Sequence, residues 1–257
     1  MTDLRPIIEI IDENFMIPQL NRTRRISALL PYDYYSTDKK YSVLYLHDGQ
    51  NLFDDYAPYG NWGVDKTLAK MAAQGQSDTI IIAIDHGGEL RIKELIPFKT
   101  RKFGEVEGEQ YLDFMMHTLR PMINEKYRIH QDRNCTGIGG SSLGGLISLY
   151  AGFKYPHIFG KMMIFSPSLW VTNDIYIEAL NFPNDIATDI YLYAGGLESE
   201  THHDNVSKLA EVLMGKHAMH QKLNLKFVTN PHGRHQEVYW GEQFPLAVEY
   251  LFYRDKC

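Results

Sequence analysis

Two adjacent serines in a glycine-rich segment, Gly140-Ser-Ser-Leu-Gly144, have the clearest potential for chemistry. The segment fits the pattern G-x-S-x-G when Ser142 is the central serine, and it stands between a predicted strand and a predicted helix. On such a sharp turn, the residues two before and two after the serine approach too closely for a Cβ atom, so both should be glycine. Leu143 takes the second of these positions for Ser141, whereas Ser142 has glycine at both. We therefore predict that Ser142 is a nucleophile.

The same segment could instead be a packing turn or a phosphate-binding loop. A Walker A loop requires Gly-Lys-Ser/Thr, and these residues do not follow here. A helix that begins after Ser142 has free N–H groups and a dipole that favours negative charge nearby. We therefore expect the N–H of Leu143 to bind an oxyanion that forms when Ser142 attacks a carbonyl group.

The elements that must position this serine follow from the apolar pattern. Short β-rich runs alternate with longer helical patterns, and the run 78–85 is almost continuously apolar, as expected for a strand buried on both faces. This alternation predicts an α/β fold with a mostly parallel central sheet and helices on both faces. We expect one domain over residues 1–257, in which about the first 20 residues form an extended lead-in or edge hairpin. The predicted strands are 24–30, 41–47, 78–85, 134–139, 161–166, 189–194 and 224–229, and the predicted helices are 109–127, 143–155, 205–217 and 236–253.

Four segments, in this order along the chain, resemble the esterase branch of the α/β-hydrolase superfamily. This branch includes enterochelin-esterase-like and feruloyl-esterase-like enzymes and the mycobacterial mycolyltransferases. The resemblance extends from about Ile17 to Phe252 and implies an α/β-hydrolase fold and a serine esterase. The four segments are Leu44-Tyr-Leu-His-Asp-Gly-Gln-Asn-Leu-Phe53, Gly140-Ser-Ser-Leu-Gly-Gly145, Phe165-Ser-Pro-Ser168 and Gly233-Arg-His-Gln-Glu-Val-Tyr-Trp240.

A serine nucleophile needs an imidazole that takes its proton and a carboxylate that orients the imidazole. In α/β-hydrolases the chain order is Ser, acid, His, so the base should follow the predicted strand 224–229. His232 and His235 are the candidates there. We predict His235, because it matches the family's Gly-x-His-x-Glu-x-x-Trp and precedes the last predicted helix. The two histidines could also be metal ligands, but no third ligand is evident, and we expect the cluster 202–204 (His-His-Asp) to be solvated.

The triad acid should lie in the loop after the predicted strand 189–194. This loop reads Gly195-Gly-Leu-Glu-Ser-Glu200. In the resembling enzymes the carboxylate falls about three residues after the first glycine of the loop, which implies Glu198 as the acid. Glu200 remains the alternative, because a shift of one turn is not resolved by sequence position.

A second donor to the oxyanion is expected in the loop that follows the predicted strand 41–47. The loop reads His47-Asp-Gly-Gln50. Gly49 lets the backbone turn closely, and the resemblance assigns the donor N–H to Gln50. We expect Asp48 to stabilise the turn rather than to take part in catalysis.

Substrate contacts are predicted for Trp62, Arg91 and Trp170. These residues, together with Tyr59, lie in loops near the expected carboxyl ends of the strands, where sheets of this type bind ligands. Arg91 could hold an anionic group or pair with Glu94. The aromatic side chains could equally pack in the core or at the rim.

Composition and charge restrict the class of protein. Twenty-six Lys+Arg against 32 Asp+Glu give a formal charge of -6, so electrostatics gives no reason to expect nucleic acid or an anionic membrane as a partner. The apolar runs are far shorter than the roughly 18–20 residues that span a bilayer, and the first residues do not resemble a signal peptide. Two cysteines, Cys135 and Cys257, are too few for a disulfide framework or a Cys-rich metal site. We therefore expect a cytoplasmic protein.

Together these features predict an α/β-hydrolase that cleaves small-molecule carboxylic esters through an acyl-enzyme. Ser142 would attack, His235 would shuttle the proton and Glu198 would orient the imidazole, without a metal or organic cofactor. Acyl transfer to an acceptor other than water uses the same triad and is an alternative. A non-catalytic binding module with this fold and a metal-dependent hydrolase are the others. No oligomeric state is predicted.

Overall fold

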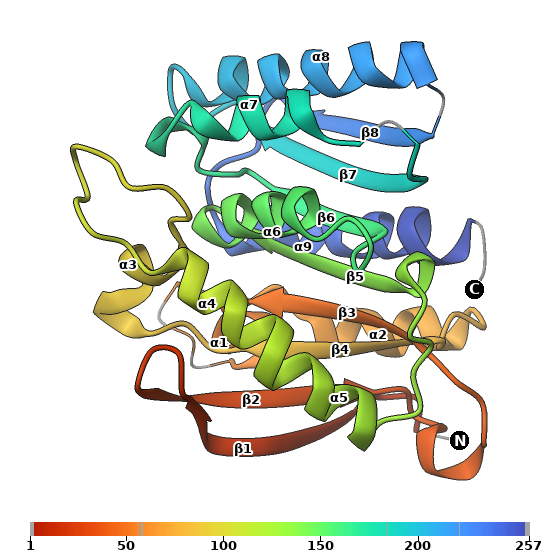
Figure 1. Ribbon diagram of the computed structural model, residues 1–257. Helices are drawn as coiled ribbons and strands as arrows, with labels where there is room; N and C mark the ends of the chain where they lie inside the picture. Colours follow the sequence, from red (N-terminus) through yellow and green to blue (C-terminus); the bar gives the residue numbers. More distant parts are fainter. Residues whose placement is uncertain (1–2, 56, 58, 184, 221, 255–257) are drawn as a thin grey trace.

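The computed structural model describes residues 3–254 except 56, 58, 184 and 221, so Cys257 lies outside the described residues. Its centre is an eight-stranded sheet with the strand order β1-β2-β4-β3-β5-β6-β7-β8 (Figure 1). The bounds are β1 (Ile7–Ile17), β2 (Arg22–Leu30), β3 (Ser42–His47), β4 (Thr79–Ile84), β5 (Thr136–Ser141), β6 (Lys161–Phe165), β7 (Thr188–Gly195) and β8 (Leu223–Asn230).

Strands β3 to β8 run parallel, and β2 is antiparallel to both of its neighbours, β1 and β4. The sheet confirms the predicted α/β-hydrolase fold class, because it is mostly parallel and has helices on both faces. All seven predicted strands form, with ends that differ from the prediction by at most two residues. The expected lead-in forms the edge hairpin alternative, since β1 pairs along β2.

Helices cover the sheet in two layers. In Figure 1, α4, α6 and α8 lie in front of the sheet and α2 and α9 lie behind it. The predicted helix 109–127 forms but contains a π-helical turn, Met115–Leu119. Among the described residues, four short α-helices, α1, α2, α3 and α7, were not predicted. Helices of four to ten residues repeat the helical period too few times to stand out in the sequence. The bounds are α1 (Gln50–Phe53), α2 (Val64–Ala73), α3 (Arg91–Leu95), α4 (Gly108–Phe114), α5 (Arg120–Lys126), α6 (Leu143–Lys154), α7 (Asp174–Asn181), α8 (His202–His220) and α9 (Glu237–Val248).

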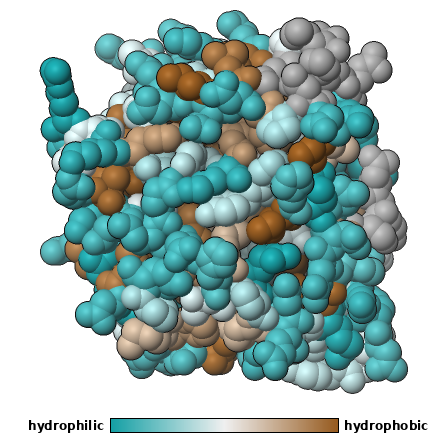
Figure 2. Space-filling view, viewed as in Figure 1, coloured by the Kyte–Doolittle hydropathy of each residue, from teal (hydrophilic) through white to brown (hydrophobic). Residues whose placement is uncertain are grey.

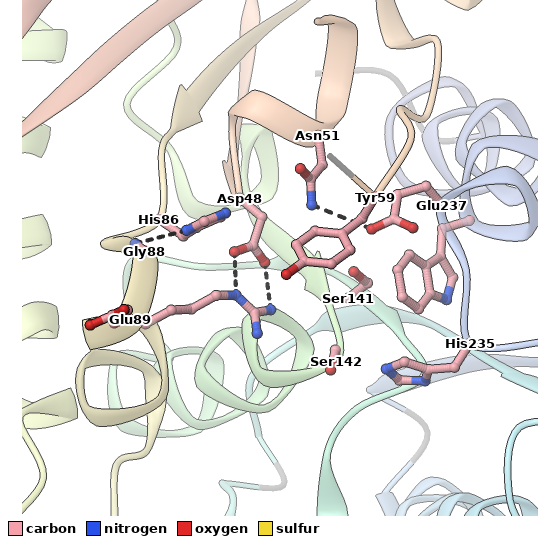
Figure 3. Close-up of a pocket in the computed structure, with 12 residues that line it drawn as sticks. Asp48, Asn51, Tyr59, His86, Gly88, Glu89, Ser141, Ser142, His235 and Glu237 are labelled. Atoms are coloured by element: carbon pink, nitrogen blue, oxygen red, sulfur yellow. Dashed lines mark hydrogen bonds and ion pairs between the residues drawn. The ribbon is translucent and has the colours of Figure 1, made fainter. Parts of the chain in front are cut away.

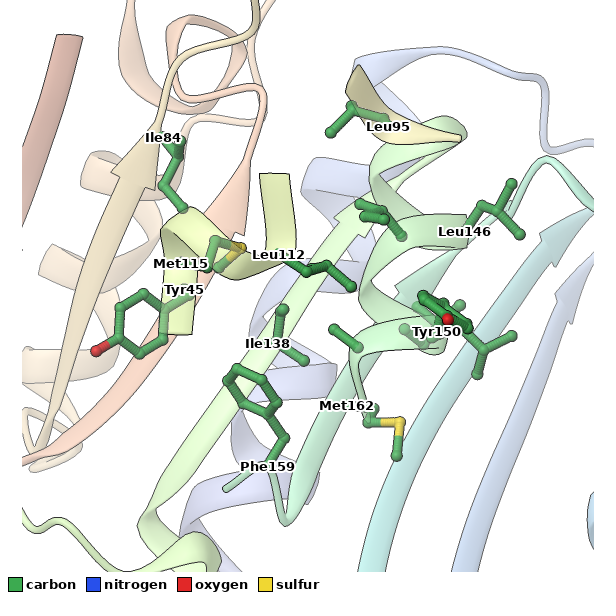
Figure 4. Close-up of a cluster of buried hydrophobic side chains, with 14 of the residues drawn as sticks. Tyr45, Ile84, Leu95, Leu112, Met115, Ile138, Leu146, Tyr150, Phe159 and Met162 are labelled. Atoms are coloured by element: carbon green, nitrogen blue, oxygen red, sulfur yellow. The ribbon is translucent and has the colours of Figure 1, made fainter. Parts of the chain in front are cut away.

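Burial of the central strands explains why the sheet forms. Every residue of β4 is buried. Its Ile80, Ile82 and Ile84 belong to the apolar cluster under the front helices, whereas Ile81 and Ala83 belong to the cluster under the rear helices. Figure 4 shows the front cluster, in which Ile84 and Ile138 of the sheet face Leu112 and Leu146 of the helices. Alternate side chains therefore anchor the strand between two apolar layers.

The outer surface of the front helices is mainly hydrophilic, with small separate apolar areas (Figure 2). No helix among the described residues combines the length and the apolar character needed to cross a membrane. Because β3 to β8 are parallel, the loops after their carboxyl ends meet at one edge of the sheet. In such sheets this edge is the usual place for a ligand site.

Candidate active site

The turn between β5 and α6 holds Ser142 in a strained conformation. Its φ and ψ are 58° and −123°, and its N–H donates to the carbonyl of Phe165 at 3.0 Å. A Cβ atom on Gly140 would lie 2.9 Å from the carbonyl carbon of Gly144, which is closer than real side chains approach. Glycine is therefore required at position 140 because the backbones of Gly140 and Gly144 lie in direct contact across the turn.

Glu198 is a buried carboxylate with hydrogen-bond donors on both oxygens. Its side chain is 1% exposed. Its Oε1 accepts the Ser166 hydroxyl and the Gly195 N–H, each at 2.6 Å, and its Oε2 lies 2.6 Å from Nδ1 of His235. Burial alone would raise the pKa of Glu198, but the hydrogen bonds from His235, Ser166 and Gly195 hold it below its usual value. Glu200, the alternative acid, is exposed.

His235 is oriented by this carboxylate. An ionised carboxylate can only accept hydrogen bonds, so Nδ1 of His235 carries the proton and Nε2 is left with a lone pair. Figure 3 shows the imidazole pointing toward Ser142 from the neighbouring wall of the cavity. The ring packs edge-on against Trp240 at 4.9 Å between centroids and is 39% exposed. The side chain of His232 is exposed.

The hydroxyl of Ser142 also has a partner on the β6 side. Its Oγ lies 3.2 Å from Oγ of Ser168, and the Ser168 N–H donates to the Ser142 carbonyl at 3.0 Å. Ser168 is buried. The segment that follows β6 thus holds Ser142 through these two contacts with Ser168.

The two predicted oxyanion donors are the first residues of two helices. Gln50 begins α1 and Leu143 begins α6, so neither N–H has a partner within its own helix. The Gln50 side chain is tied to the backbone of His86, since its Oε1 accepts the His86 N–H at 2.9 Å. A Cβ atom on Gly49 would lie 3.1 Å from backbone atoms of both Ala83 and Asp85, which leaves little room for a side chain before Gln50.

Ser142 and His235 line a cavity of about 570 Å³, whereas Gln50, Leu143 and Glu198 are not among its lining residues. Arg91 lies in its wall and makes a two-point ion pair with Asp48, at 2.5 and 2.8 Å, instead of the pair with Glu94 that the sequence suggested. Glu94 pairs with Arg24 at 2.6 Å. Burial would raise the pKa of Asp48, but Arg91 holds it below its usual value. The lining consists of Asp48, Asn51, Tyr59, His86, Gly88, Glu89, Arg91, Ser141, Ser142, His235, Glu237 and Trp240.

The two predicted tryptophan contacts lie outside this lining. Trp62 is 5% exposed and packs in the rear core against Phe165, at 5.3 Å between ring centroids, so we correct it to a core residue. Trp170 is 53% exposed, its ring is tilted against that of Phe103 at 5.9 Å between centroids, and the ammonium group of Lys102 lies over its face. Phe103 is partly buried against the front apolar cluster, and neither aromatic residue belongs to the cavity lining.

The sequence interpretation missed three residues that contact Glu198 or His235, namely Ser166, His202 and Trp240. Ser166, with φ 44°, accepts the Trp240 indole N–H at 2.9 Å while it donates to Glu198. The expectation that residues 202–204 are solvated is wrong for His202, which is 6% exposed because α8 begins against Glu198 and His235. Ser166 and Trp240 belong to two of the four segments that resemble the esterase branch, but the sequence analysis assigned neither of them a role.

Glu237 is a further polar group in the cavity wall. It begins α9, is buried, and accepts a hydrogen bond from Asn51 Nδ2 at 3.3 Å. Burial raises its pKa. In the ranges that the structure describes, no group of three or more His, Cys, Asp or Glu side chains is arranged to hold a metal ion.

Comparisons with known proteins bear on the family and the fold of the chain. A family model described as "Putative esterase" matches residues 17–251. The uncharacterized protein YbbA of Bacillus subtilis (strain 168) is 27% identical over 251 residues, which cover 91% of this chain and 94% of that protein. The solved BES protein from Bacillus cereus has 21% identity and a TM-score of 0.77, covering 95% of this chain and 94% of that one. An IroE-like serine hydrolase from Shewanella oneidensis has 18% identity and a TM-score of 0.76, covering 96% and 80%.

Proposed function

The chain belongs to this esterase family and is an esterase, and from that premise we propose that it cleaves small-molecule carboxylic esters through an acyl-enzyme on Ser142. The observation that carries the proposal is the contact of 2.6 Å between Glu198 and Nδ1 of His235. It leaves Nε2 of His235 as the free basic nitrogen beside a serine on a strained turn.

Acylation begins when Nε2 of His235 removes the hydroxyl proton of Ser142. The Ser142 oxygen then attacks the ester carbonyl carbon, and the carbonyl electrons move onto its oxygen. The N–H groups of Gln50 and Leu143 donate to this oxyanion, and one such donor typically contributes about 3–4 kcal/mol to lowering the barrier. The intermediate collapses, the alcohol leaves, and His235 returns the proton to it.

Deacylation repeats these steps with water. His235 removes a proton from the water, the hydroxide attacks the acyl carbon, and the proton returns to the Ser142 oxygen as the acid leaves. Glu198 stays ionised throughout, orients His235 and stabilises the imidazolium that forms twice per turnover. The cavity above Ser142 has room for an acyl group of moderate size.

A serine-reactive fluorophosphonate probe tests this proposal. We expect one covalent adduct, which mass spectrometry of the digested protein places on Ser142. The adduct should be absent from the Ser142→Ala protein and present in Ser141→Ala. An adduct on another residue, or none on a protein that hydrolyses esters, would overturn the mechanism.

A panel of chemically diverse esters, with purified Ser142→Ala assayed beside the wild type, then finds the substrate class. The panel should include aryl esters, sugar esters and siderophore lactones. We expect activity to survive exhaustive EDTA treatment, because no step of the proposed chemistry requires a metal ion. Activity that disappears with chelator and returns with Zn²⁺ would favour a metal-dependent hydrolase.

A further inference from the structure

The turn that carries Gln50 is held by the segment that follows β4, residues 85–91. Asp48, two residues before Gln50, has a φ of 58°, and its carboxylate accepts hydrogen bonds from Nε and Nη2 of Arg91 at 2.5 and 2.8 Å (Figure 3). The side-chain amide of Gln50 is bound to the backbone of His86 in the same segment. The side chain of Asp48 is only 6% exposed, so this ion pair is largely withdrawn from water. One segment therefore fixes both the strained residue and the proposed oxyanion donor that follows it.

The Asp48 carboxylate also lies beside the second proposed donor. A Cβ atom on Gly144 would lie 3.0 Å from Oδ2 of Asp48, so the carboxylate packs against the backbone directly after Leu143. Burial alone would raise the pKa of Asp48, but Arg91 holds it below its usual value, so Asp48 is ionised at neutral pH. The proposed mechanism forms another negative charge, the oxyanion, at the N–H of Leu143. Two negative charges close together in a buried site repel each other strongly unless a cation compensates one of them.

Arg91 is the cation that compensates Asp48. Of the described residues that line the cavity, it is the one arginine or lysine, and two of its nitrogens donate to the same carboxylate. A two-point contact of this kind fixes the direction of the carboxylate as well as its charge. Loss of one partner from a buried ion pair leaves the other charge uncompensated. The guanidinium therefore acts on the protein before any substrate is bound.

We propose that Arg91 is a positioning residue of the oxyanion hole, which acts through Asp48 rather than by contact with the substrate. The inference rests on the proposed function, since it needs Ser142 as the nucleophile and the N–H groups of Gln50 and Leu143 as donors. Arg91 fixes the strained turn before Gln50, so that its N–H needs no reorganisation when the oxyanion forms. It also cancels the charge that Asp48 would otherwise add beside Leu143. Both effects stabilise the tetrahedral intermediate and not the bound ester, so they raise kcat without changing substrate affinity.

The labelling rate of a neutral fluorophosphonate measures this role without knowledge of the natural substrate. Attack by the serine places negative charge on the phosphoryl oxygen, which the same oxyanion hole stabilises. Arg91→Met removes the charge at similar side-chain length and should lower the second-order rate constant by about tenfold or more, since a whole oxyanion donor is worth about 100- to 1,000-fold. With a neutral ester, kcat should fall by a similar factor and KM should stay unchanged.

Asp48→Asn breaks the same ion pair but leaves no negative charge, and asparagine tolerates a positive φ. We expect it to lower the labelling rate only about threefold, because it weakens the fixation of the turn alone. The double variant Arg91→Met/Asp48→Asn should label as fast as Asp48→Asn, since Arg91 acts only through the Asp48 carboxylate.

Lys161→Met is the control for loss of a buried ion pair. It separates Asp189 from Lys161 at the start of β6, at the end of the sheet away from Ser142. We expect this variant to lose stability and to keep the wild-type labelling rate. Circular dichroism and thermal melting identify the variants that fold.

Two results would overturn the proposal. One is a wild-type labelling rate in folded Arg91→Met. The other is a double variant in which the losses of the two single changes multiply, as expected if Arg91 contacts the probe itself. If Arg91→Met does not fold, a wild-type rate in Asp48→Asn or a further loss in the double variant decides against it. A wild-type protein that is not labelled on Ser142 removes the proposed function, whereas a labelled wild type beside unaffected Arg91 variants removes only the role of Arg91.

Discussion

The turn that carries the nucleophile and the loop that carries the acid are built in different ways. The turn is one continuous segment, and its shape depends on contacts between backbone atoms of Gly140 and Gly144. The acid site is assembled from separate loops, because Glu198 meets Ser166 after β6 and His235 after β8. Backbone contacts within one segment leave a pattern of glycines in the sequence. Side-chain contacts between distant segments leave no fixed spacing.

Strain shows what the two regions share. Three residues directly after strands β3, β5 and β6 have positive φ: Asp48, Ser142 and Ser166. They follow adjacent strands of the sheet. Such conformations cost of order 1–3 kcal/mol each and persist where the surroundings hold them. Here Asp48 is held by Arg91, and Ser166 by Glu198 and Trp240. Both regions therefore depend on packing that fixes unfavourable backbone conformations at the edge of the sheet.

The largest effect is expected from Ser142→Ala, which tests the turn. Loss of a triad nucleophile typically lowers kcat by about a million-fold. The fold should persist, since the alanine can occupy the same backbone conformation at a similar cost. Ser141→Ala is the control and should keep most of the activity, because its position lacks the paired glycines. Activity of the Ser142→Ala protein comparable to wild type, with contamination excluded, would contradict the assignment.

A loss nearly as large is expected from His235→Ala, which tests the contact between the two regions. Triad members act as a unit, so removal of the base should cost about as much as removal of the nucleophile. Steady-state rates of His232→Ala provide the comparison. We expect it to stay active, because its side chain is exposed. A dead His232→Ala enzyme beside an active His235→Ala enzyme would reverse the base assignment.

Glu198→Gln should lower kcat by about ten-thousand-fold, less than the other two triad changes. The amide keeps the size of the side chain but removes the charge that stabilises a protonated His235. Glu200→Gln, two residues along the same loop, should be close to wild type because Glu200 is exposed. If Glu200→Gln were inactive and Glu198→Gln active, Glu200 and not Glu198 would be the triad acid.

How far the sequence predicted each region follows from this contrast. The glycines predicted the turn, because a local steric contact requires them there. The apolar run of β4 predicted a strand of the sheet, because that strand is buried on both faces. The burial of His202 could not be predicted from the sequence, since it depends on where α8 begins relative to the β8–α9 loop. The placement of Trp62 was misjudged for a similar reason. An aromatic residue in a loop looks the same whether it faces a cavity or the core.

Gly140→Ala tests the turn through stability. The added methyl group would lie 2.9 Å from the Gly144 carbonyl carbon, a backbone atom that cannot rotate away. We expect the free energy of unfolding to fall by about 1–3 kcal/mol in urea titrations. Gly215→Ala is the matched control, because no atom lies within 4 Å of the new methyl group and α8 should gain up to about 1 kcal/mol of stability. Equal stability of the two variants would show that the turn can accommodate a methyl group at position 140.

The smallest effect is expected from Ser166→Ala, which removes one member of the acid site. Glu198 would keep the Gly195 N–H and the contact with His235, so kcat should fall only about tenfold. The Trp240 indole N–H would lose its acceptor in a buried site, so the free energy of unfolding should drop by about 1–3 kcal/mol.

The control for this change is Ser199→Ala, in the exposed part of the same loop, which should stay within about 0.5 kcal/mol of wild type. Rates and urea titrations on both proteins separate two accounts of the acid site. If several donors share the orientation of Glu198, Ser166→Ala loses a little activity and a measurable part of its stability. A loss as severe as that of Glu198→Gln would mean that one hydroxyl fixes the carboxylate alone. The acid site would then be as intolerant of single changes as the turn, and the contrast between the two regions would fail.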